Sequence, residues 1–411
     1  MEDLMHSFFL VKEKQYRKLF LAGLINGVGD RFSQVATLTL LLQLTGSGFA
    51  VGVTMALRLL PFLIFGPFGG RLADRYSRKT LLVVTDLARI AFALSFLLVH
   101  TRQDIWIIYV SSFILASGEA IYAPTRKATL PLLISRKQLV KVNSMEQVLV
   151  GIVLIGGAFA GGVVSYFFGP DLTFWLNGFS FLAAAWLIST IQFINPTRHH
   201  EDPNTKKERL SLSLKNVILL SIPLQIILLC EILVPFVNGI DNVLISVYAV
   251  EIFHLDNVGV GTFYGALGIG LMASFSIANR INKHYLLIGL SCLFFEGCMM
   301  IFLSHAYSTL FAVMIFCSSA FFSGIGNACL DTVLMREIPE QHQGMMFALM
   351  ASLSNTLLGL SMLIAGGSLD VISPRLLGFL GGTSLLCISV FLIMTYLIRK
   401  SKEVSSQDET I

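Results

Sequence analysis

Five charged residues lie in otherwise apolar stretches of the sequence, where an ionised group is expensive to bury. They are the carboxylates of Asp30, Glu119, Glu231 and Asp241 and the guanidinium of Arg58. A charge within hydrocarbon costs at least about 2.5 kcal/mol, so it usually faces a cavity, a partner or a transported species. A carboxylate in such a place can take up and release a proton or hold a ligand. We therefore expect these five residues to include those that couple to protons or bind substrate.

Asp30 is the principal candidate for proton coupling among these acids. It lies about 16 Å into its helix at 1.5 Å per residue, which is close to mid-membrane. The structural alternative is an internal ion pair, either with the adjacent Arg31 or with Arg58. Glu296, in a segment expected to be peripheral, is interpreted instead as a residue that bonds within the helix bundle.

Uncharged polar residues accompany the acids at helical spacing. In the first apolar segment the stripe runs Asn26, Asp30, Ser33, Thr37, at intervals that place all four on one helix face. The fourth, seventh and tenth apolar segments repeat this enrichment, and we expect these four helices to line one polar cavity. The cavity residues predicted in this way are Asn26, Ser33, Thr37, Asn238, Asn242, Ser323, Asn327 and Asp331.

The elements that must position these residues are membrane helices. Of the 411 residues, 55% are hydrophobic and only 13% charged, against about 25% charged in ordinary soluble domains. The apolar runs are roughly 20 residues long, which spans a bilayer, and backbone groups inside a bilayer require helices. Twelve are predicted: 19–44, 47–68, 81–100, 106–124, 143–168, 172–194, 222–249, 257–279, 285–304, 308–329, 344–369 and 374–398.

Basic residues predict the orientation of these helices. With a cytoplasmic N-terminus, 24 of the 29 Lys and Arg fall on the inner side, three lie within helices, and only Arg102 and Arg375 lie in outer loops. Cytoplasmic loops are enriched in Lys and Arg, so both termini are predicted to be cytoplasmic. The net charge of +4 reflects this distribution and does not indicate nucleic-acid binding.

The chain divides into two halves around its longest hydrophilic stretch. We predict a six-helix bundle over 1–194, a cytoplasmic linker over 195–215, a second bundle over 216–399 and a polar cytoplasmic tail over 400–411. Gly161-Gly162 and Gly366-Gly367 lie 205 positions apart, which is half the chain length. Such duplication is typical of transporters whose central site lies between two repeats.

A basic loop between the second and third helices carries the clearest motif. Residues 70–81 read Gly-Arg-Leu-Ala-Asp-Arg-Tyr-Ser-Arg-Lys-Thr-Leu, and this loop resembles the motif that follows the second helix of the major facilitator superfamily. The resemblance implies an all-α membrane fold of two pseudo-symmetric six-helix bundles. It also implies that the loop gates the inner side, with Asp74 near Gly344 at the start of the eleventh helix. The gating residues are Gly70, Asp74, Arg75, Arg78 and Lys79, with Asp86 and Arg89 as structural partners of the loop.

Further motifs resemble the branch of the superfamily that contains macrolide-efflux proteins and the enterobactin exporter. They are Gly29-Asp30, Leu44-Thr45-Gly46-Ser47, Arg58-x-x-Pro61, Tyr122-Ala123-Pro124 and the segment 139–143. The resemblance implies proton-coupled efflux of an amphipathic organic compound by alternating access. The arginine of the fourth helix that many drug antiporters share is absent, because Ser117-Gly118-Glu119-Ala120 occupies that region.

The alternatives within transport are a siderophore or lysophospholipid carrier and, with less support, a metal exporter. A membrane enzyme or sensor is the alternative outside transport, but no catalytic motif, phosphate loop or metal-ligand spacing is present. We therefore expect no catalytic residues, no metal and no cofactor. The expected partners are the lipid bilayer, a small amphipathic substrate and protons, and not nucleic acid. A monomer in a bacterial inner membrane is the predicted functional form.

Overall fold

A computed structural model describes residues 14–45, 48–192, 221–339, 342–369 and 371–408 of the chain. Throughout these ranges the regular structure is helical, and they contain no strand. The predicted linker over 195–215 lies outside the described residues.

Within the described residues, the first half contains six long helical segments. They are α2 (Lys14–Thr45), α3 (Gly48–Arg75), α4 (Arg78–Ser95), α5 (Ile105–Leu133), a segment made of α6 (Leu139–Ile152) and α7 (Ala158–Phe168), and α8 (Pro170–Ser189). One π-helical turn, Val153–Gly157, joins α6 to α7.

The second half also contains six long helices. They are α10 (Ile222–Val247), α11 (Asp256–Ala278), α12 (Tyr285–Ser304), α13 (Thr309–Glu337), α14 (Gln343–Ser368) and α15 (Pro374–Asp408). Across the described residues, ten helices are long and apolar enough to cross a membrane. The two long helices outside that set are α2 and α3, which carry Asp30 and Arg58. The predicted all-α membrane architecture is confirmed.

Two of the predicted boundaries are wrong by about ten residues. The helix predicted over 106–124 continues as α5 to Leu133, through Pro124 and Pro131. Prolines are tolerated within membrane helices because neighbouring groups satisfy the freed backbone carbonyls. The last helix likewise passes its predicted end at 398 and continues to Asp408. The extension of α5 matters because it places Arg126 and Lys127 on a helix and not in a loop.

Local sequence explains where several helices begin. Ser77, Ser221 and Ser308 precede α4, α10 and α13, and each hydroxyl accepts a hydrogen bond from the backbone N–H three residues later. Serine is a favoured N-cap because this bond satisfies an otherwise unpaired donor. Gly169 separates α7 from α8 at φ 83°, a conformation that glycine adopts without a Cβ clash.

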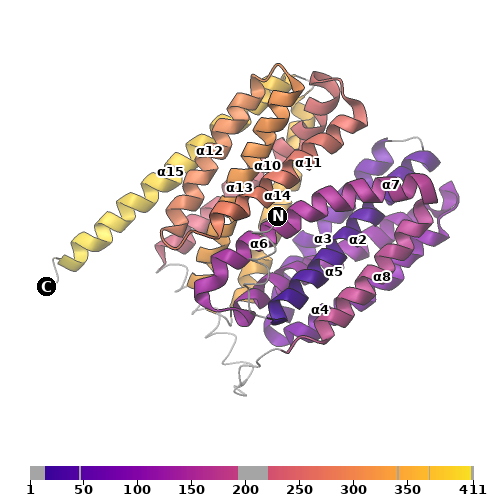
Figure 1. Cartoon of the computed structure of the whole chain (residues 1–411), viewed down its shortest axis with the longest axis horizontal. Coiled ribbons are helices and arrows are strands. Elements are labelled where there is room, and N and C mark those ends of the chain that lie inside the picture. The colour runs from indigo at the N-terminus through magenta and orange to yellow at the C-terminus, as the bar shows by residue number, and fades with distance from the viewer. Residues whose placement is uncertain (1–13, 46–47, 193–220, 340–341, 370, 409–411) are drawn as a thin grey trace.

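The helices form two bundles that correspond to the two halves of the sequence (Figure 1). In the first half α2 packs against α8, and α3 packs against α5; in the second, α11 packs against α13, and α12 against α15. The halves meet where α3 contacts α14 and where α6 contacts α11. Each contact joins the second helical segment of one half to the fifth of the other, as expected for two related bundles.

Glycines permit the close approach of helices in and between the halves. A Cβ at Gly151 of α6 would lie 2.5 Å from the carbonyl oxygen of Gly268 on α11. A Cβ at Gly161 of α7 would lie 2.8 Å from the Cα of Phe32 on α2. Small residues allow membrane helices to approach closely, so these glycines contribute to packing within and between the halves.

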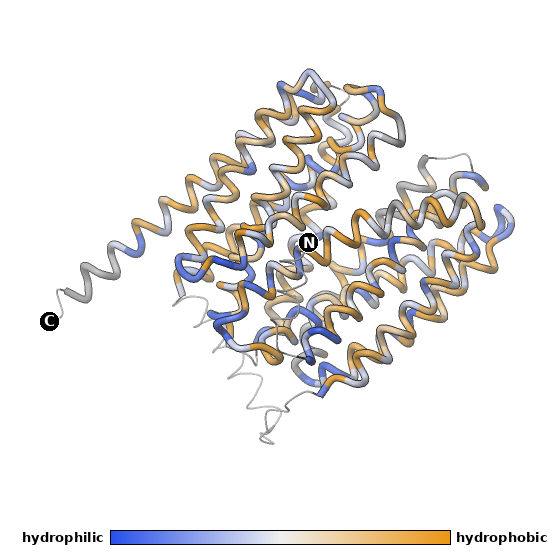
Figure 2. Tube along the Cα trace, in the orientation of Figure 1, coloured by the Kyte–Doolittle hydropathy of each residue, from blue (hydrophilic) through white to orange (hydrophobic). Residues whose placement is uncertain are grey.

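Hydrophilic residues gather at one end of the two bundles, while most of the helical length is apolar (Figure 2). This end, called the basic end below, contains the turns between α3 and α4, between α5 and α6, and between α13 and α14. Its charged residues include Arg75, Arg78, Lys79, Arg136 and Arg336. It is the end that the distribution of Lys and Arg predicts to be cytoplasmic.

Candidate functional site

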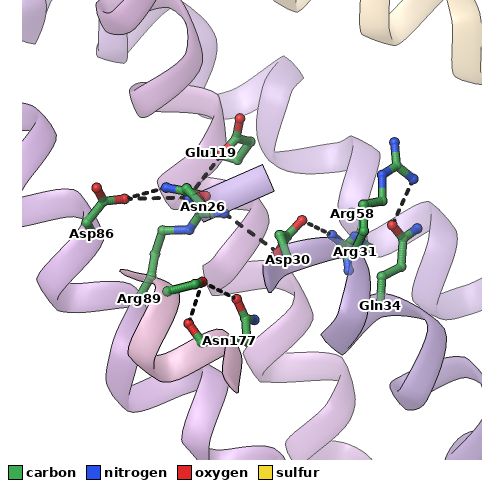
Figure 3. A network of polar contacts seen from close by, with 10 residues as sticks. Asn26, Asp30, Arg31, Gln34, Arg58, Asp86, Arg89, Glu119 and Asn177 are labelled. Carbon is green, nitrogen blue, oxygen red and sulfur yellow. Dashed lines mark hydrogen bonds and ion pairs between the residues drawn. The ribbon is translucent and has the colours of Figure 1, made fainter. Parts of the chain in front are cut away.

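A cluster of ion pairs occupies the interior of the first half, with Arg89 of α4 at its centre (Figure 3). The Arg89 guanidinium lies 3.0 Å from Glu119 of α5, 3.8 Å from Asp30 of α2 and 3.9 Å from Asp86 of α4. Its side chain is only 2% exposed and lies over the ring of Phe181 on α8, 4.3 Å from the ring centroid. We call Asp30, Arg58, Asp86, Arg89 and Glu119 the arginine cluster.

Asp30 is held between two arginines in this cluster. Arg58 of α3 donates a hydrogen bond of 2.9 Å to its Oδ2, and Arg89 approaches its Oδ1. The adjacent Arg31 bonds instead to Gln34, at 3.0 Å (Figure 3). Opposite charges this close favour the ionised carboxylate. The structure therefore places Asp30 in the ion pair with Arg58 that was the structural alternative, and not alone at mid-membrane.

Asp86 is the member of the cluster with the weakest charge compensation. Its side chain is fully buried, and its Oδ1 accepts a 2.8 Å hydrogen bond from Asn26 of α2. Among the described residues, its Oδ2 has no hydrogen-bond partner. The prediction that Asp86 and Arg89 are partners of the basic loop is wrong, because both contribute to the buried cluster.

The polar stripe of the first helix does not line an open cavity. Asn26, Ser33 and Thr37 are 4%, 3% and 3% exposed. Asn26 donates a hydrogen bond to Asp86, and the Thr37 hydroxyl donates a hydrogen bond of 2.7 Å to the carbonyl of Ser33. The structure places these three residues in the packed interior of the first bundle, which corrects their predicted position.

The second half instead forms most of a partly open cavity of about 280 Å³. Its walls come mainly from α10, α12 and α13, with a contribution from α6 of the first half. Four predicted cavity residues line it together with one predicted acid: Asn238, Asn242, Ser323, Asn327 and Asp241. Apolar side chains such as Met299, Met300 and Phe316 complete the lining. We call this the acidic cavity.

Two carboxylates, Asp241 and Glu296, line the acidic cavity. They are close enough to interact electrostatically, and Glu296 lies beside the hydroxyl of Ser323. Glu296 is a cavity residue that the sequence did not indicate, because its helix was expected to be peripheral. The available signal was a lone carboxylate in the apolar run from Tyr285 to Ser304, which is α12.

The two halves are bridged by polar contacts at the basic end. Lys127 of α5 forms an ion pair of 2.6 Å with Asp331 of α13. Asn143 of α6 donates to Thr332 of α13 at 3.0 Å, and Arg336 donates to the carbonyl of Arg136 at 2.9 Å. Asp331, predicted to line the cavity, is therefore a bridging residue. We call these three contacts the basic-end bridge.

Further charges surround the basic-end bridge. Arg126 pairs with Glu146 at 2.5 Å, and Glu146 also accepts a hydrogen bond from Tyr16 at 3.1 Å. Glu231 accepts a hydrogen bond from Ser354 and interacts electrostatically with Lys127, so it belongs to this region and not to the cavity. Arg126, Lys127 and Glu146 are site residues that the sequence did not indicate; the first two were expected in a loop.

The basic loop contacts its own half of the molecule. Arg78 donates to the carbonyl of Ala128 on α5, and Lys79 donates to the carbonyl of Ile191 at 3.0 Å. The guanidinium of Arg75 lies 5.9 Å from the ring of Tyr76. The side chain of Asp74 and any contact at Gly70 lie outside the described residues, so the predicted approach of Asp74 to Gly344 stays a prediction.

Potential metal ligands are not clustered in the parts of the chain that the structure describes. Within them, no group of three or more His, Cys, Asp or Glu side chains is arranged to hold a metal ion.

Comparison with known proteins gives matches over most of the chain. The profile of the Major Facilitator Superfamily matches residues 19–360. Macrolide efflux protein A of Streptococcus pyogenes is 23% identical over 389 residues, which cover 89% of this chain and 92% of that protein. Multidrug resistance protein MdtH of Proteus mirabilis is 28% identical over 222 residues, which cover 51% and 53% of the two chains.

Solved structures share the fold at low sequence identity. The human organic anion transporter MFSD10 (TETRAN) has a TM-score of 0.77 at 13% identity and covers 91% of this chain and 98% of its own. A bacterial homologue of the iron transporter ferroportin, in an outward-facing state, has a TM-score of 0.71 at 17% identity and covers 94% and 100%. These likenesses support the arrangement of the helices.

Proposed function

The chain belongs to the major facilitator superfamily and is a multi-pass membrane transporter, and we propose that it exports an amphipathic organic compound in exchange for protons by alternating access. Efflux is named for macrolide efflux protein A, which matches most of the chain, and multidrug resistance is named for MdtH, which matches half of it. The proposal concerns the substrate class, the coupling ion and the mechanism.

The observation that carries this proposal is the position of the acidic cavity relative to the basic-end bridge. The bridge ties α5 and α6 of the first half to α13 of the second at the basic end. On α13, the cavity residues Ser319, Ser323 and Asn327 precede Asp331 by about one to three helical turns, farther from the basic end. A site sealed from one end by contacts between the halves is what alternating access requires in one of its states.

The lining of the cavity supports an amphipathic substrate. Leucine, isoleucine, methionine and phenylalanine account for half of the lining residues, and eight amide, hydroxyl and carboxyl side chains lie among them. Ligand sites usually combine an apolar lining with a few placed polar groups. Methionine adapts its shape readily, so such walls can accommodate ligands of different outline.

The arginine cluster supplies the groups for proton coupling in this proposal. Its three carboxylates share two guanidinium groups, and the contacts join α2, α3, α4 and α5. Protonation of one carboxylate would break an ion pair between helices and so change their relative stability. Asp30 and Glu119 are the members that bridge helices directly, because each pairs with an arginine of another helix.

Transport into inside-out membrane vesicles tests the proposal. A radiolabelled macrolide, a siderophore and a lysophospholipid are offered as probes, with the vesicle lumen acidified and then with the proton gradient collapsed by nigericin and valinomycin. We expect accumulation of at least one amphipathic probe that stops when the gradient is collapsed. Accumulation that ignores the gradient would remove proton coupling, and transport of a metal ion alone would remove the substrate class.

Opening of the basic-end bridge provides a second test. Lys127→Met removes the cation that pairs with Asp331, so thiol labelling of Asn143→Cys from the basic end should accelerate in a cysteine-free background. Lys137→Met is the matched control, because Lys137 is an exposed lysine of the neighbouring turn. A charge exchange, Lys127→Asp with Asp331→Lys, should restore slow labelling. Equal labelling in all variants would contradict the role of the bridge.

A further inference from the structure

We propose that the acidic cavity is a binding site for an organic cation, with Asp241 and Glu296 as its counter-ions. The ligand class is an amphipathic molecule that carries a protonated amine or another permanently charged cationic group. This inference rests on the proposed transport function, since it names the chemistry of the substrate, and it assigns Glu296 to the site.

The charge balance of the cavity is the first argument. Its described lining contains two carboxylates and no lysine, arginine or histidine. Asp241 and Glu296 interact electrostatically, and Glu296 is only 7% exposed. Buried carboxylates are unfavourable unless protons or a cation neutralise them. A cationic ligand would supply the charge that the protein does not.

Unused polar groups around the carboxylates are the second argument. Within the described residues, Oδ1 of Asp241 is buried and has no hydrogen-bond partner. The Tyr248 hydroxyl also has none, although its side chain is fully buried. That hydroxyl points at Gly378 of the cavity wall, where a Cβ would lie only 2.7 Å from it. Buried polar groups are normally bonded, so the unpartnered Oδ1 of Asp241, which lines the cavity, indicates a ligand site, while the Tyr248 hydroxyl lies behind the wall at Gly378.

Arg375 interacts electrostatically with Tyr248, but its guanidinium contacts other groups. Arg375, at the start of α15, donates to the carbonyl of Ser304 at 3.1 Å and lies 5.3 Å from the ring centroid of Tyr307. It is not part of the cavity lining. Arg375 therefore does not act as the counter-ion of the cavity carboxylates, whereas Arg58 and Arg89 do so for the carboxylates of the arginine cluster.

The apolar lining selects the rest of the ligand. Met299, Met300, Leu303 and Phe316 surround the carboxylates, and the cavity measures about 280 Å³. An aromatic ring and soft thioethers favour a weakly hydrated organic cation over a small, strongly hydrated ion. The site therefore suits an alkyl- or aryl-substituted ammonium or phosphonium better than a metal ion.

Binding to the purified full-length protein in nanodiscs tests this inference. Tetraphenylphosphonium and tetraphenylborate are suitable probes because they share their shape and differ in the sign of their charge. We expect tetraphenylphosphonium to bind and tetraphenylborate not to compete for its site. Asp241→Asn and Glu296→Gln should each weaken tetraphenylphosphonium binding about tenfold or more, equivalent to about 1.4 kcal/mol.

Glu251→Gln is the matched control for the loss of one carboxylate. Glu251 follows α10 in the same helical segment as Asp241 but is exposed, so its removal should leave affinity unchanged. Unchanged affinity in both cavity variants, or competition by tetraphenylborate for the same site, would overturn the inference. If a variant does not fold, protection of Asp241 in the native protein from carbodiimide by tetraphenylphosphonium answers the same question, and lack of protection counts against the site.

Equilibrium binding needs no gradient, so this test is separate from that of transport. Charge-selective binding without gradient-driven accumulation would refute proton-coupled export and leave the cation site intact. Gradient-driven export that does not change when Asp241 and Glu296 are substituted would refute the cation site and leave proton-coupled export intact.

Discussion

The two halves of the molecule bury carboxylates in opposite ways. In the first half, Asp30 and Glu119 are partly exposed, with 21% and 37% of their side-chain surface accessible, and they face the guanidinium groups of Arg58 and Arg89. In the second half, Asp241 and Glu296 face a cavity whose described lining has no basic residue. Two bundles of the same fold therefore contain one internally compensated site and one that lacks a counter-charge.

This difference separates carboxylates whose charge the protein compensates from carboxylates whose charge a bound ligand would compensate. Removal of one partner from a buried ion pair leaves an uncompensated charge, which is strongly destabilising. Removal of an unpaired buried carboxylate instead relieves a desolvation cost. Equivalent substitutions in the two halves should therefore change stability in opposite directions, and that sign is the most direct test of the comparison.

Arg89→Met should have the largest effect. It leaves Asp30, Asp86 and Glu119 without their shared guanidinium, so the free energy of unfolding should fall by about 3–5 kcal/mol. Reversible unfolding in mixed SDS and dodecylmaltoside micelles measures this change. Arg102→Met, at an exposed position whose guanidinium bonds to backbone carbonyls, is the control. Equal stability of the two variants would show that the arginine cluster is not an electrostatic unit.

Asp30→Asn should have the next largest effect, on transport as well as on stability. It replaces the carboxylate that accepts the 2.9 Å bond from Arg58 by a neutral amide, which removes the charge and so part of the about 1.5–3 kcal/mol that a hydrogen bond to a charged group contributes. Gradient-driven transport should fall at least about tenfold while substrate binding is retained, because the acidic cavity lies in the other half. If Asp30 serves only the ion pair, Asp30→Asn combined with Arg58→Met should recover transport, and that recovery would remove Asp30 from proton coupling.

The sequence predicted the fold far better than the pairing of charges. Apolar runs and the distribution of Lys and Arg predict helices and their ends because bilayer thickness and backbone hydrogen bonding leave few alternatives. The error at α5 came from Pro124 and Pro131, which usually end helices but remain inside this one. That error moved Lys127 into a loop and hid its contact with Asp331.

Residues far apart in the sequence explain what could not be predicted at the site. Asn238, Asn242, Ser323 and Asn327 were recognisable from their helical spacing, and they do meet at the acidic cavity. The stripe of Asn26, Ser33 and Thr37 has the same spacing, yet it faces the packed interior. Spacing fixes which residues share a helix face, whereas the neighbouring helices decide whether that face borders a cavity.

The combined variant Asp241→Asn and Glu296→Gln should change stability in the opposite direction. Replacement of two mutually repelling carboxylates by amides should raise the free energy of unfolding by about 1 kcal/mol in the absence of ligand. The same micelle titration measures it, with Glu251→Gln as the control at an exposed position. A loss of stability as large as that of Asp30→Asn would mean that a cation within the protein compensates these carboxylates, and the contrast between the halves would fail.

Asp86→Asn should have the smallest effect, and it defines the limit of the comparison. Asp86 belongs to the first half by position, yet its Oδ2 lacks a partner among the described residues, as does Oδ1 of Asp241. An asparagine retains an acceptor oxygen for Asn26 and loses only the 3.9 Å contact with Arg89, which exceeds hydrogen-bonding distance. The free energy of unfolding should therefore change by less than about 1 kcal/mol. Asp30→Asn, measured in parallel, provides the reference for a fully paired carboxylate. A change as large as that of Asp30→Asn would show that membership of the cluster, and not contact geometry, sets the contribution of each acid.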